Sequence, residues 1–210
     1  MMESYECWEI KGRTLEYLDD IHLYLVDGVP VKSVTQLIGY KFKDEYKDVD
    51  ANTLKQASVR GTAIHKVIED YCTQGIESDV PELKGFKTLQ KLYKFDVLAN
   101  EVPVILEDKK GEVIGAGRLD IVMEMGGKIG GADIKRTYTL NKEKLGYQLN
   151  LYRIAYRQSY GTEWEFLKGI HLRYYEKTGE LKRQMVDIPI NEDFIWNYLE
   201  ELKDAGKISL

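Results

Sequence analysis

Two adjacent glycines, Gly126 and Gly127, stand between two strand-like runs and constrain the fold more than any other feature of the sequence. Both central positions of a type I′ hairpin turn need a positive φ, which glycine adopts without steric cost. A two-residue turn here pairs Met125 with Lys128, and the same register puts Asp120 opposite Asp133. The sequence therefore predicts an antiparallel hairpin that brings two carboxylates together.

The two aspartates predict a cation site. Because side chains alternate along a strand, Asp120 shares a face with Arg118, and Asp133 shares the corresponding face of the next strand with Lys135. Directly opposed residues have Cβ atoms about 4.5–5.5 Å apart, where like charges are destabilising. A bound Mg²⁺ or Mn²⁺ would offset that repulsion, since hard oxygen ligands suit both ions. Two alternatives stay open: one aspartate is solvated or paired with Arg118, or a bulge in the second strand shifts the register.

The remaining elements predict an α/β chain with a mixed central sheet flanked by helices. A core in the order helix, three strands, helix, strand follows from the periodicity. We expect one domain over residues 1–210, with an N-terminal hairpin and helix extension over about 1–58. The expected elements are a hairpin in 13–32 turning at Asp27-Gly28, a helix capped by Ser33 and Gln36, helices from about 62 and over 83–98, strands over 101–106, 112–125 and 128–137, a helix over 145–160, strands over 167–176 and 181–188, and a helix over 192–206.

Composition narrows the class of protein. With 43% hydrophobic and 31% charged residues, the chain is typical of a globular protein. It has no apolar run long enough for a membrane span and no secretory signal pattern, so we expect a cytoplasmic protein. Two cysteines, Cys7 and Cys72, are too few for a disulfide framework or a four-cysteine iron–sulfur cluster. A net charge of -5 argues weakly against nonspecific coating of nucleic acid but permits one basic groove.

Four short motifs in order resemble the PD-(D/E)xK nuclease superfamily, in its RecB-type and phage exonuclease branch. They are Arg60-Gly61-Thr62-Ala63-Ile64-His65, Gly117-Arg118-Leu119-Asp120, Asp133-Ile134-Lys135 and Gln148 with Tyr152. His22-Leu23-Tyr24 and Ser33-Val34-Thr35 are also similar to segments of phage exonucleases, so the resemblance covers about residues 20–176. The chain departs from the usual pattern with Leu119 where the branch often has proline, and with Asp133 where glutamate is commoner.

The resemblance implies a restriction-endonuclease-like core and a role for each motif. Asp120, Asp133, His65 and the carbonyl of Ile134 would bind Mg²⁺ or Mn²⁺, and Lys135 would orient water and stabilise charge. Further residues would contribute at the edges: Glu69 or Glu101 to a second metal site, Gln148 and Tyr152 near the scissile phosphate or the lysine, and Arg60 on the DNA backbone. For each there is a structural alternative, such as a core tyrosine, a solvated glutamate or a solvated arginine.

The resemblance also implies a function. We expect a metal-dependent DNA exonuclease, bacterial or phage-encoded, that acts in recombination, repair or phage DNA processing. Two alternatives are a catalytically silent DNA-binding module and a restriction-type endonuclease. DNA with free ends is the expected partner, with a homo-oligomer or a recombination partner protein as further options. Cleavage polarity, strand preference and the number of metal ions are left open.

A run of lysines gives a separate hypothesis for where DNA lies. Between Glu82 and Asp96 the charged residues are Lys84, Lys87, Lys91 and Lys94. Their spacing puts them along one face of the helix expected over 83–98. Two interpretations are equally open: the lysines form a track for phosphates, or they are an ordinary solvated face.

Overall fold

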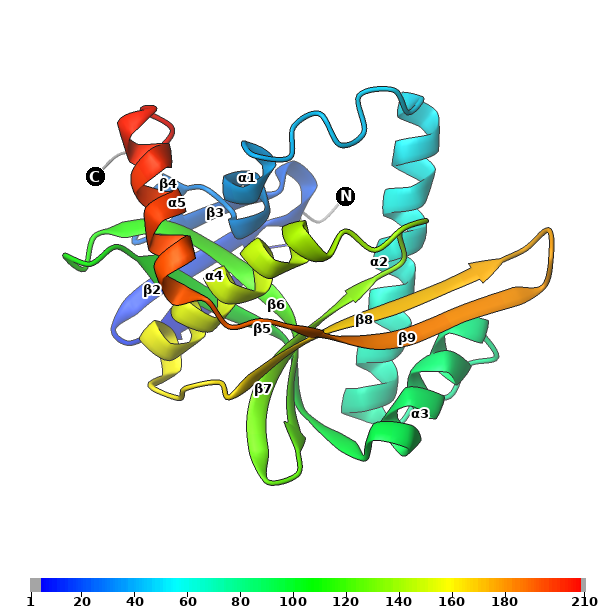
Figure 1. Cartoon of the computed structure of the whole chain (residues 1–210). Helices are drawn as coiled ribbons and strands as arrows, with labels where there is room; N and C mark the ends of the chain where they lie inside the picture. The colour runs from blue at the N-terminus through cyan, green and yellow to red at the C-terminus, as the bar shows by residue number, and fades with distance from the viewer. Residues whose placement is uncertain (1–4, 209–210) are drawn as a thin grey trace.

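Two sheets organise the protein in the computed structural model, which describes residues 5–208 (Figure 1). The smaller sheet is antiparallel, with strand order β1-β2-β3-β4. Its strands and the short helix that follows are β1 (Tyr5–Ile10), β2 (Arg13–Leu18), β3 (Leu23–Val26), β4 (Val29–Val31) and α1 (Val34–Gly39). Ile105 and Ala116 of the larger sheet pack with the inner face of the smaller sheet in one apolar cluster. The two sheets therefore share a core.

The larger sheet has the order β5-β6-β7-β8-β9 and is mixed, because β7 and β8 pair in parallel. Its elements are β5 (Phe95–Glu107), β6 (Val113–Met125), β7 (Lys128–Lys135), β8 (Phe166–Tyr175) and β9 (Glu180–Ile188), and helix α4 (Lys142–Tyr160) makes the crossover from β7 to β8. Helices α2 (Ala51–Gln74) and α3 (Pro81–Tyr93) pack on one face, while α4 and α5 (Glu192–Asp204) pack on the other. The predicted class, a mixed sheet flanked by helices, is confirmed.

The hairpin between β6 and β7 has the predicted register. Gly126 and Gly127 have φ of 62° and 78°, and the strands pair from Met125↔Lys128 to Ile121↔Ala132 without a bulge. Gly130 and Gly131 of β7 do not form a bulge; they allow aromatic side chains to pack against the strand. A Cβ on Gly130 would lie 2.4 Å from Phe166, and one on Gly131 would lie 2.0 Å from Trp164.

The N-terminal predictions also hold in their local details. Asp27 and Gly28 have φ of 52° and 76° and form the turn between β3 and β4. Ser33 accepts a hydrogen bond from the Gln36 N–H at 3.1 Å, and the Gln36 side chain accepts one from the Ser33 N–H at 2.9 Å. This reciprocal capping box starts α1 as the sequence indicates.

Two predicted helix boundaries are wrong. Helix α2 begins at Ala51, well before Thr62, because Asp50 caps it by accepting from the Thr53 N–H; its first turns are exposed and lack an apolar stripe. Helix α3 ends at Tyr93, where Lys94 takes the left-handed φ of 53° and the chain turns into β5. Within residues 5–208, none of the helices is both long and apolar enough to cross a membrane.

Candidate metal centre

Asp120 lies where the sheet ladder is interrupted on both sides. The β6–β7 pairing stops at Ile121↔Ala132, one pair short of Asp120 and Asp133, and the Ile134 N–H instead donates to Asp120 Oδ2 at 2.7 Å. On the other side, the β5–β6 pairing omits Glu101, which has the left-handed φ of 47°. Such a backbone costs a non-glycine residue about 1–3 kcal/mol and is concentrated at functional sites. The predicted direct pairing of the two aspartates is wrong in this detail.

His65 joins this break in the sheet from helix α2. Its Nε2 is 3.0 Å from the Ile134 carbonyl oxygen, and its Nδ1 is 3.5 Å from Asp120 Oδ2 and 3.9 Å from Glu101 Oε1. The ligand atoms of His65, Glu101 and Asp120 all lie within 4.8 Å of one another. The structure therefore groups Glu101 with two of the predicted ligands, His65 and Asp120, while Asp133 lies outside this group.

Asp133 is the most unusual member of the centre. Its side chain is 1% exposed, and Lys135 Nζ lies 2.6 Å from Oδ2. The other oxygen, Oδ1, has no hydrogen-bond donor among the described residues. Leaving a buried carboxylate oxygen without a donor is costly. Carboxylate oxygens, a backbone carbonyl and an imidazole nitrogen make a ligand set that fits Mg²⁺ or Mn²⁺.

The charges of the centre favour an added cation. Burial and the neighbouring Asp120 charge together raise the pKa of Asp133 to about 6, against the lowering effect of Lys135 and His65. Burial also raises the pKa of Asp120. For His65, burial lowers the pKa, but the charge of Asp120 and the bond to Glu101 outweigh it and raise the value to about 9. Keeping Asp120 and Asp133 ionised therefore costs free energy, and a bound divalent cation would reduce that cost.

Lys135 stays protonated in this environment. Burial alone would lower its pKa, but the charges of Asp133 and Asp120 outweigh burial and raise it. A lysine held in its charged form stabilises negative charge and orients water, and it is a poor general base. This favours the electrostatic role over proton abstraction.

Arg118 links the centre to the smaller sheet. Its Nε lies 3.1 Å from Glu101 Oε2, it pairs with Glu6 of β1, and its guanidinium lies 5.1 Å from the Tyr17 ring centroid. Arg118 therefore pairs with Glu101, and the predicted alternative, a pair between Arg118 and Asp120, is not formed. The sequence predicted the strand face on which Arg118 lies but not its contacts with Glu6 and Tyr17, since these two residues come from the smaller sheet.

The other predicted site residues lie at different distances from this centre. Glu69 pairs with Lys66 at 3.2 Å and lies outside the group formed by His65, Glu101 and Asp120. Gln148 and Tyr152 are buried in α4, at 5% and 4% exposure. Burial raises the pKa of Tyr152, and the charges of Tyr24, Asp120, Asp133 and Glu101 raise it further. A Cβ on Gly117 would lie 3.0 Å from its ring.

Tyr46, in the segment between α1 and α2, was not predicted. Burial and the charge of Glu45 raise its pKa, while the charge of Lys135 lowers it, so Tyr46 lies in the electric field of the centre. Lys144 lies 5.2 Å from its ring centroid and pairs with Glu45 at 2.6 Å, which holds the segment against α4. No periodic pattern in this turn-rich segment pointed to the site.

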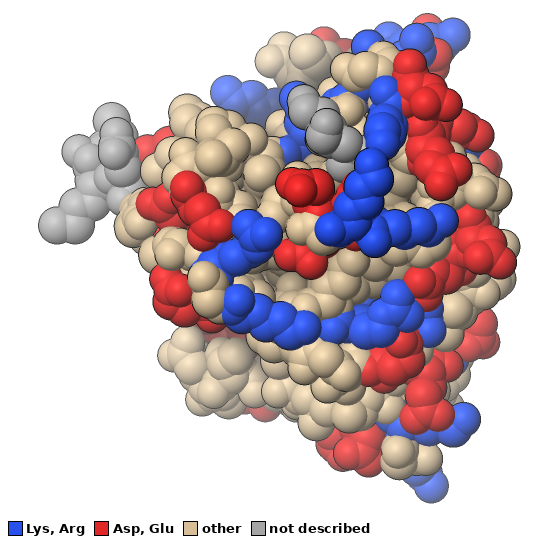
Figure 2. Space-filling model, turned by 90° about the vertical axis from the view of Figure 1, so that its left-hand side faces the viewer, with Lys and Arg blue, Asp and Glu red and all other residues tan. Residues whose placement is uncertain are grey.

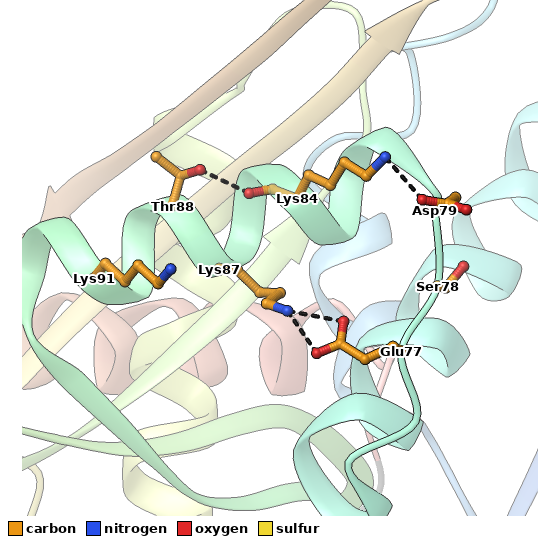
Figure 3. Close-up of a pocket in the computed structure, with 7 residues that line it drawn as sticks. All are labelled: Glu77, Ser78, Asp79, Lys84, Lys87, Thr88 and Lys91. Carbon is orange, nitrogen blue, oxygen red and sulfur yellow. Dashed lines mark hydrogen bonds and ion pairs between the residues drawn. The ribbon is translucent and has the colours of Figure 1, made fainter.

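The lysines of α3 do not form the uninterrupted basic stripe that their spacing predicted. Lys84 pairs with Asp79 at 3.0 Å, and Lys87 Nζ lies 2.6 Å and 2.8 Å from the two oxygens of Glu77 (Figure 3). These acids come from the loop before the helix, outside the stretch in which lysines are the charged residues. Lys91 lines the same hollow of about 400 Å³, while Lys94 lies past the helix end.

Arg60 and the wider surface show the same mixing of charges. Arg60 pairs with Glu176 at 3.2 Å, and both side chains are exposed. On the face shown in Figure 2, bands of Lys and Arg side chains run beside acidic ones. Exposed pairs of this kind contribute little to stability and leave little net positive field for a polyanion.

Comparisons with known proteins leave the family open. No family model matches the sequence, and no curated protein matches it. Among similar solved structures is the crystal structure of SSO0001, with a TM-score of 0.43 and 19% sequence identity over 83% of this chain and 76% of that chain. A likeness this weak says nothing about activity.

Proposed function

We propose that the protein is a metal-dependent deoxyribonuclease with a restriction-endonuclease-like core, acting as an exonuclease on DNA ends. One observation carries the proposal: the buried Asp133 carboxylate, whose Oδ2 contacts Lys135 and whose Oδ1 has no hydrogen-bond donor among the described residues, lies beside a second carboxylate and a histidine. Apart from α3, which is inserted between α2 and β5, the element order α2, β5–β7, α4, β8 agrees with the core that the motif resemblance implies.

Each residue of the centre has a definite task in this proposal. Asp120, Asp133, the Ile134 carbonyl and His65 would hold Mg²⁺ or Mn²⁺, with Glu101 completing the set. The bound cation would supply charge neutralisation at the phosphate and lower the pKa of water. Lys135 offers its ammonium to the developing negative charge, and Arg118 orients Glu101.

The test is digestion of end-labelled linear DNA with Mg²⁺ or Mn²⁺, with EDTA as the blank. Asp120→Ala, Asp133→Ala and Lys135→Ala should each abolish cleavage, whereas the aspartate variants alone should lose metal affinity. Asp187→Ala is a matched control, because Asp187 also pairs with a lysine of the same sheet, Lys168, but is 86% exposed. Near-normal turnover in any of the three site variants would reject the mechanism.

Two alternatives give different results in the same assay. A restriction-type endonuclease would cut closed circular DNA, which an exonuclease leaves intact. A silent DNA-binding module would bind the labelled DNA and release no product with either ion. Wild-type protein that degrades linear DNA from its ends and spares closed circles supports the proposal.

A further inference from the structure

We propose that Tyr138, Arg173 and Tyr175 form a platform on which unpaired bases of single-stranded DNA stack next to the candidate metal centre, an inference that rests on the proposed nuclease function and names its substrate class. The Tyr138 side chain is 73% exposed. Its ring meets Tyr175 edge to face at 6.0 Å between centroids. The Arg173 guanidinium lies 5.7 Å from the Tyr138 centroid and 5.2 Å from the Tyr175 centroid.

The platform lies on the same face of the sheet as Lys135. In the parallel β7–β8 ladder Lys135 pairs with His171, and laterally paired residues share a face. Alternation along β8 then puts Arg173 and Tyr175 on that face, with Lys182 of β9 paired opposite Arg173. A strand that crosses the platform therefore leads toward Lys135.

Hydrogen bonds fix the platform to the segment that follows Lys135. Arg173 Nη1 donates to the Arg136 carbonyl at 2.9 Å. His171 lies 2.7 Å from the Thr137 carbonyl through Nε2, while Gln184 lies 3.2 Å from its Nδ1. The hairpin of β8 and β9 extends beyond α4 in Figure 1, so no helix covers this end of the face among the described residues. The platform is thus fixed by hydrogen bonds and remains accessible to a ligand.

The chemistry of these side chains fits a single strand. Aromatic rings and arginine planes stack on bases of any sequence, whereas the bases of a duplex are already stacked on one another. Lys182 has no acidic partner within residues 5–208, and Arg173 Nε is buried without a hydrogen-bond acceptor there. Lys182 can serve the phosphates that accompany the bases, whereas the buried Arg173 Nε does not reach them. The lysines of α3, in contrast, are engaged with Glu77 and Asp79.

The test measures binding without cleavage, by fluorescence anisotropy in EDTA with the full chain. The probes are a labelled oligo(dT), the same length with abasic sites, and a blunt duplex. Tyr138→Ala should weaken binding of oligo(dT) about tenfold, in line with the loss of one stacked base, and should leave the abasic strand unchanged. Lys182→Ala should weaken both single strands. Tyr160→Ala is the control, a tyrosine of 42% exposure at the far end of α4.

Each outcome separates the platform from the nuclease. Binding that depends on Tyr138 without cleavage in Mg²⁺ or Mn²⁺ keeps the platform and rejects the nuclease. Cleavage with unchanged oligo(dT) binding in Tyr138→Ala rejects the platform alone. Equal losses for the duplex, the abasic strand and oligo(dT) would also overturn it, because they exclude stacking of unpaired bases. Circular dichroism of each variant confirms that the comparison is between folded proteins.

Discussion

In two clusters of charged side chains, the surroundings shift the pKa of a carboxyl group in opposite directions. In the candidate metal centre, burial and the charge of Asp120 raise the pKa of Asp133 to about 6, and Oδ1 of this carboxylate lacks a hydrogen-bond donor among the described residues. Between α4 and α5, Arg157 donates to both oxygens of Glu192 at 2.7 Å and 2.9 Å, and Trp196 Nε1 donates at 3.1 Å. The hydrogen bonds from Arg157 lower the pKa of Glu192 to about 2, against the opposing effect of burial.

The difference teaches how to separate charges that stabilise a fold from charges that are kept for chemistry. A carboxylate with several donors is more acidic than in the unfolded chain, so its ionisation stabilises the folded state. A carboxylate with a raised pKa destabilises the folded state when it is ionised. The charges of the candidate metal centre therefore become favourable to the folded state only when a cation binds. The cluster between α4 and α5 stabilises the folded state without a ligand.

The largest expected effect is that of Asp133→Asn, which removes the charge and keeps the shape. Cleavage should fall at least about 1,000-fold, because a metal ligand supplies several kcal/mol of transition-state stabilisation. The same substitution should increase the stability of the folded protein. The pKa of Asp133 is raised from 3.8 to about 6, so its charge costs stability fully above about pH 6 and not at all below 3.8.

In metal-free protein, Asp133→Asn should therefore give a higher melting temperature than the wild type at pH 8 and an equal one near pH 3.5. Thermal unfolding of both proteins in EDTA at the two pH values measures this. A lower melting temperature of the variant at pH 8 would mean that the Asp133–Lys135 pair is structural, and the contrast with the α4–α5 cluster would fail.

His65→Ala should have the next largest effect. An imidazole nitrogen suits Mn²⁺ better than Mg²⁺, so we expect the wild type to prefer Mn²⁺ and the variant to lose most of that preference, by about tenfold in the activity ratio. Initial rates with each ion, at saturating concentrations, give the ratio. An unchanged ratio would make His65 a structural partner of the Ile134 carbonyl, with no ligand role.

The sequence predicted the hairpin and its register because they follow from local rules. Gly126 and Gly127 fix the turn, and a turn of known length fixes every pair that follows it. The left-handed backbone of Glu101, and with it the place of Glu101 beside His65, coincides with a missing pair in the β5–β6 ladder, which keeps the same register on both sides of it. No residue pattern in one strand reveals such a missing pair.

The predictions that failed did so because the deciding partners lie outside the pattern that was read. The exposed start of α2 has no apolar stripe, so its cap at Asp50 was overlooked. The acids Glu77 and Asp79 precede α3 and meet its lysines only in three dimensions. Tyr138 and Arg173 are far apart in the chain and come together only where β8 lies beside β7.

Glu192→Gln should show a smaller effect, with the pH dependence reversed relative to Asp133→Asn. The pKa of Glu192 is lowered from 4.5 to about 2, so its contribution is complete above about pH 4.5 and is lost as the pH falls toward 2. The side chain is 29% exposed, so solvent screening limits the destabilisation at pH 7 to about 1 kcal/mol. Urea unfolding at pH 7 and pH 3 measures the difference, which should shrink at the lower pH.

The smallest expected effect is that of replacing Lys87 and Lys91 together with alanine. If both lysines bound phosphates, the slope of log K against log salt would fall by about 0.7–0.9 for each phosphate released. Lys87 is already held by Glu77, and breaking that pair to reach a phosphate gives little net gain, so we expect a decrease equivalent to at most one phosphate. Binding of oligo(dT) in EDTA at several salt concentrations measures the slope. Glu77→Gln is the matched partner variant: it frees Lys87, and a steeper slope in this variant would show that the acid masks a phosphate-binding lysine. A decrease equivalent to two phosphates in the double variant would contradict the expectation and restore α3 as a DNA track.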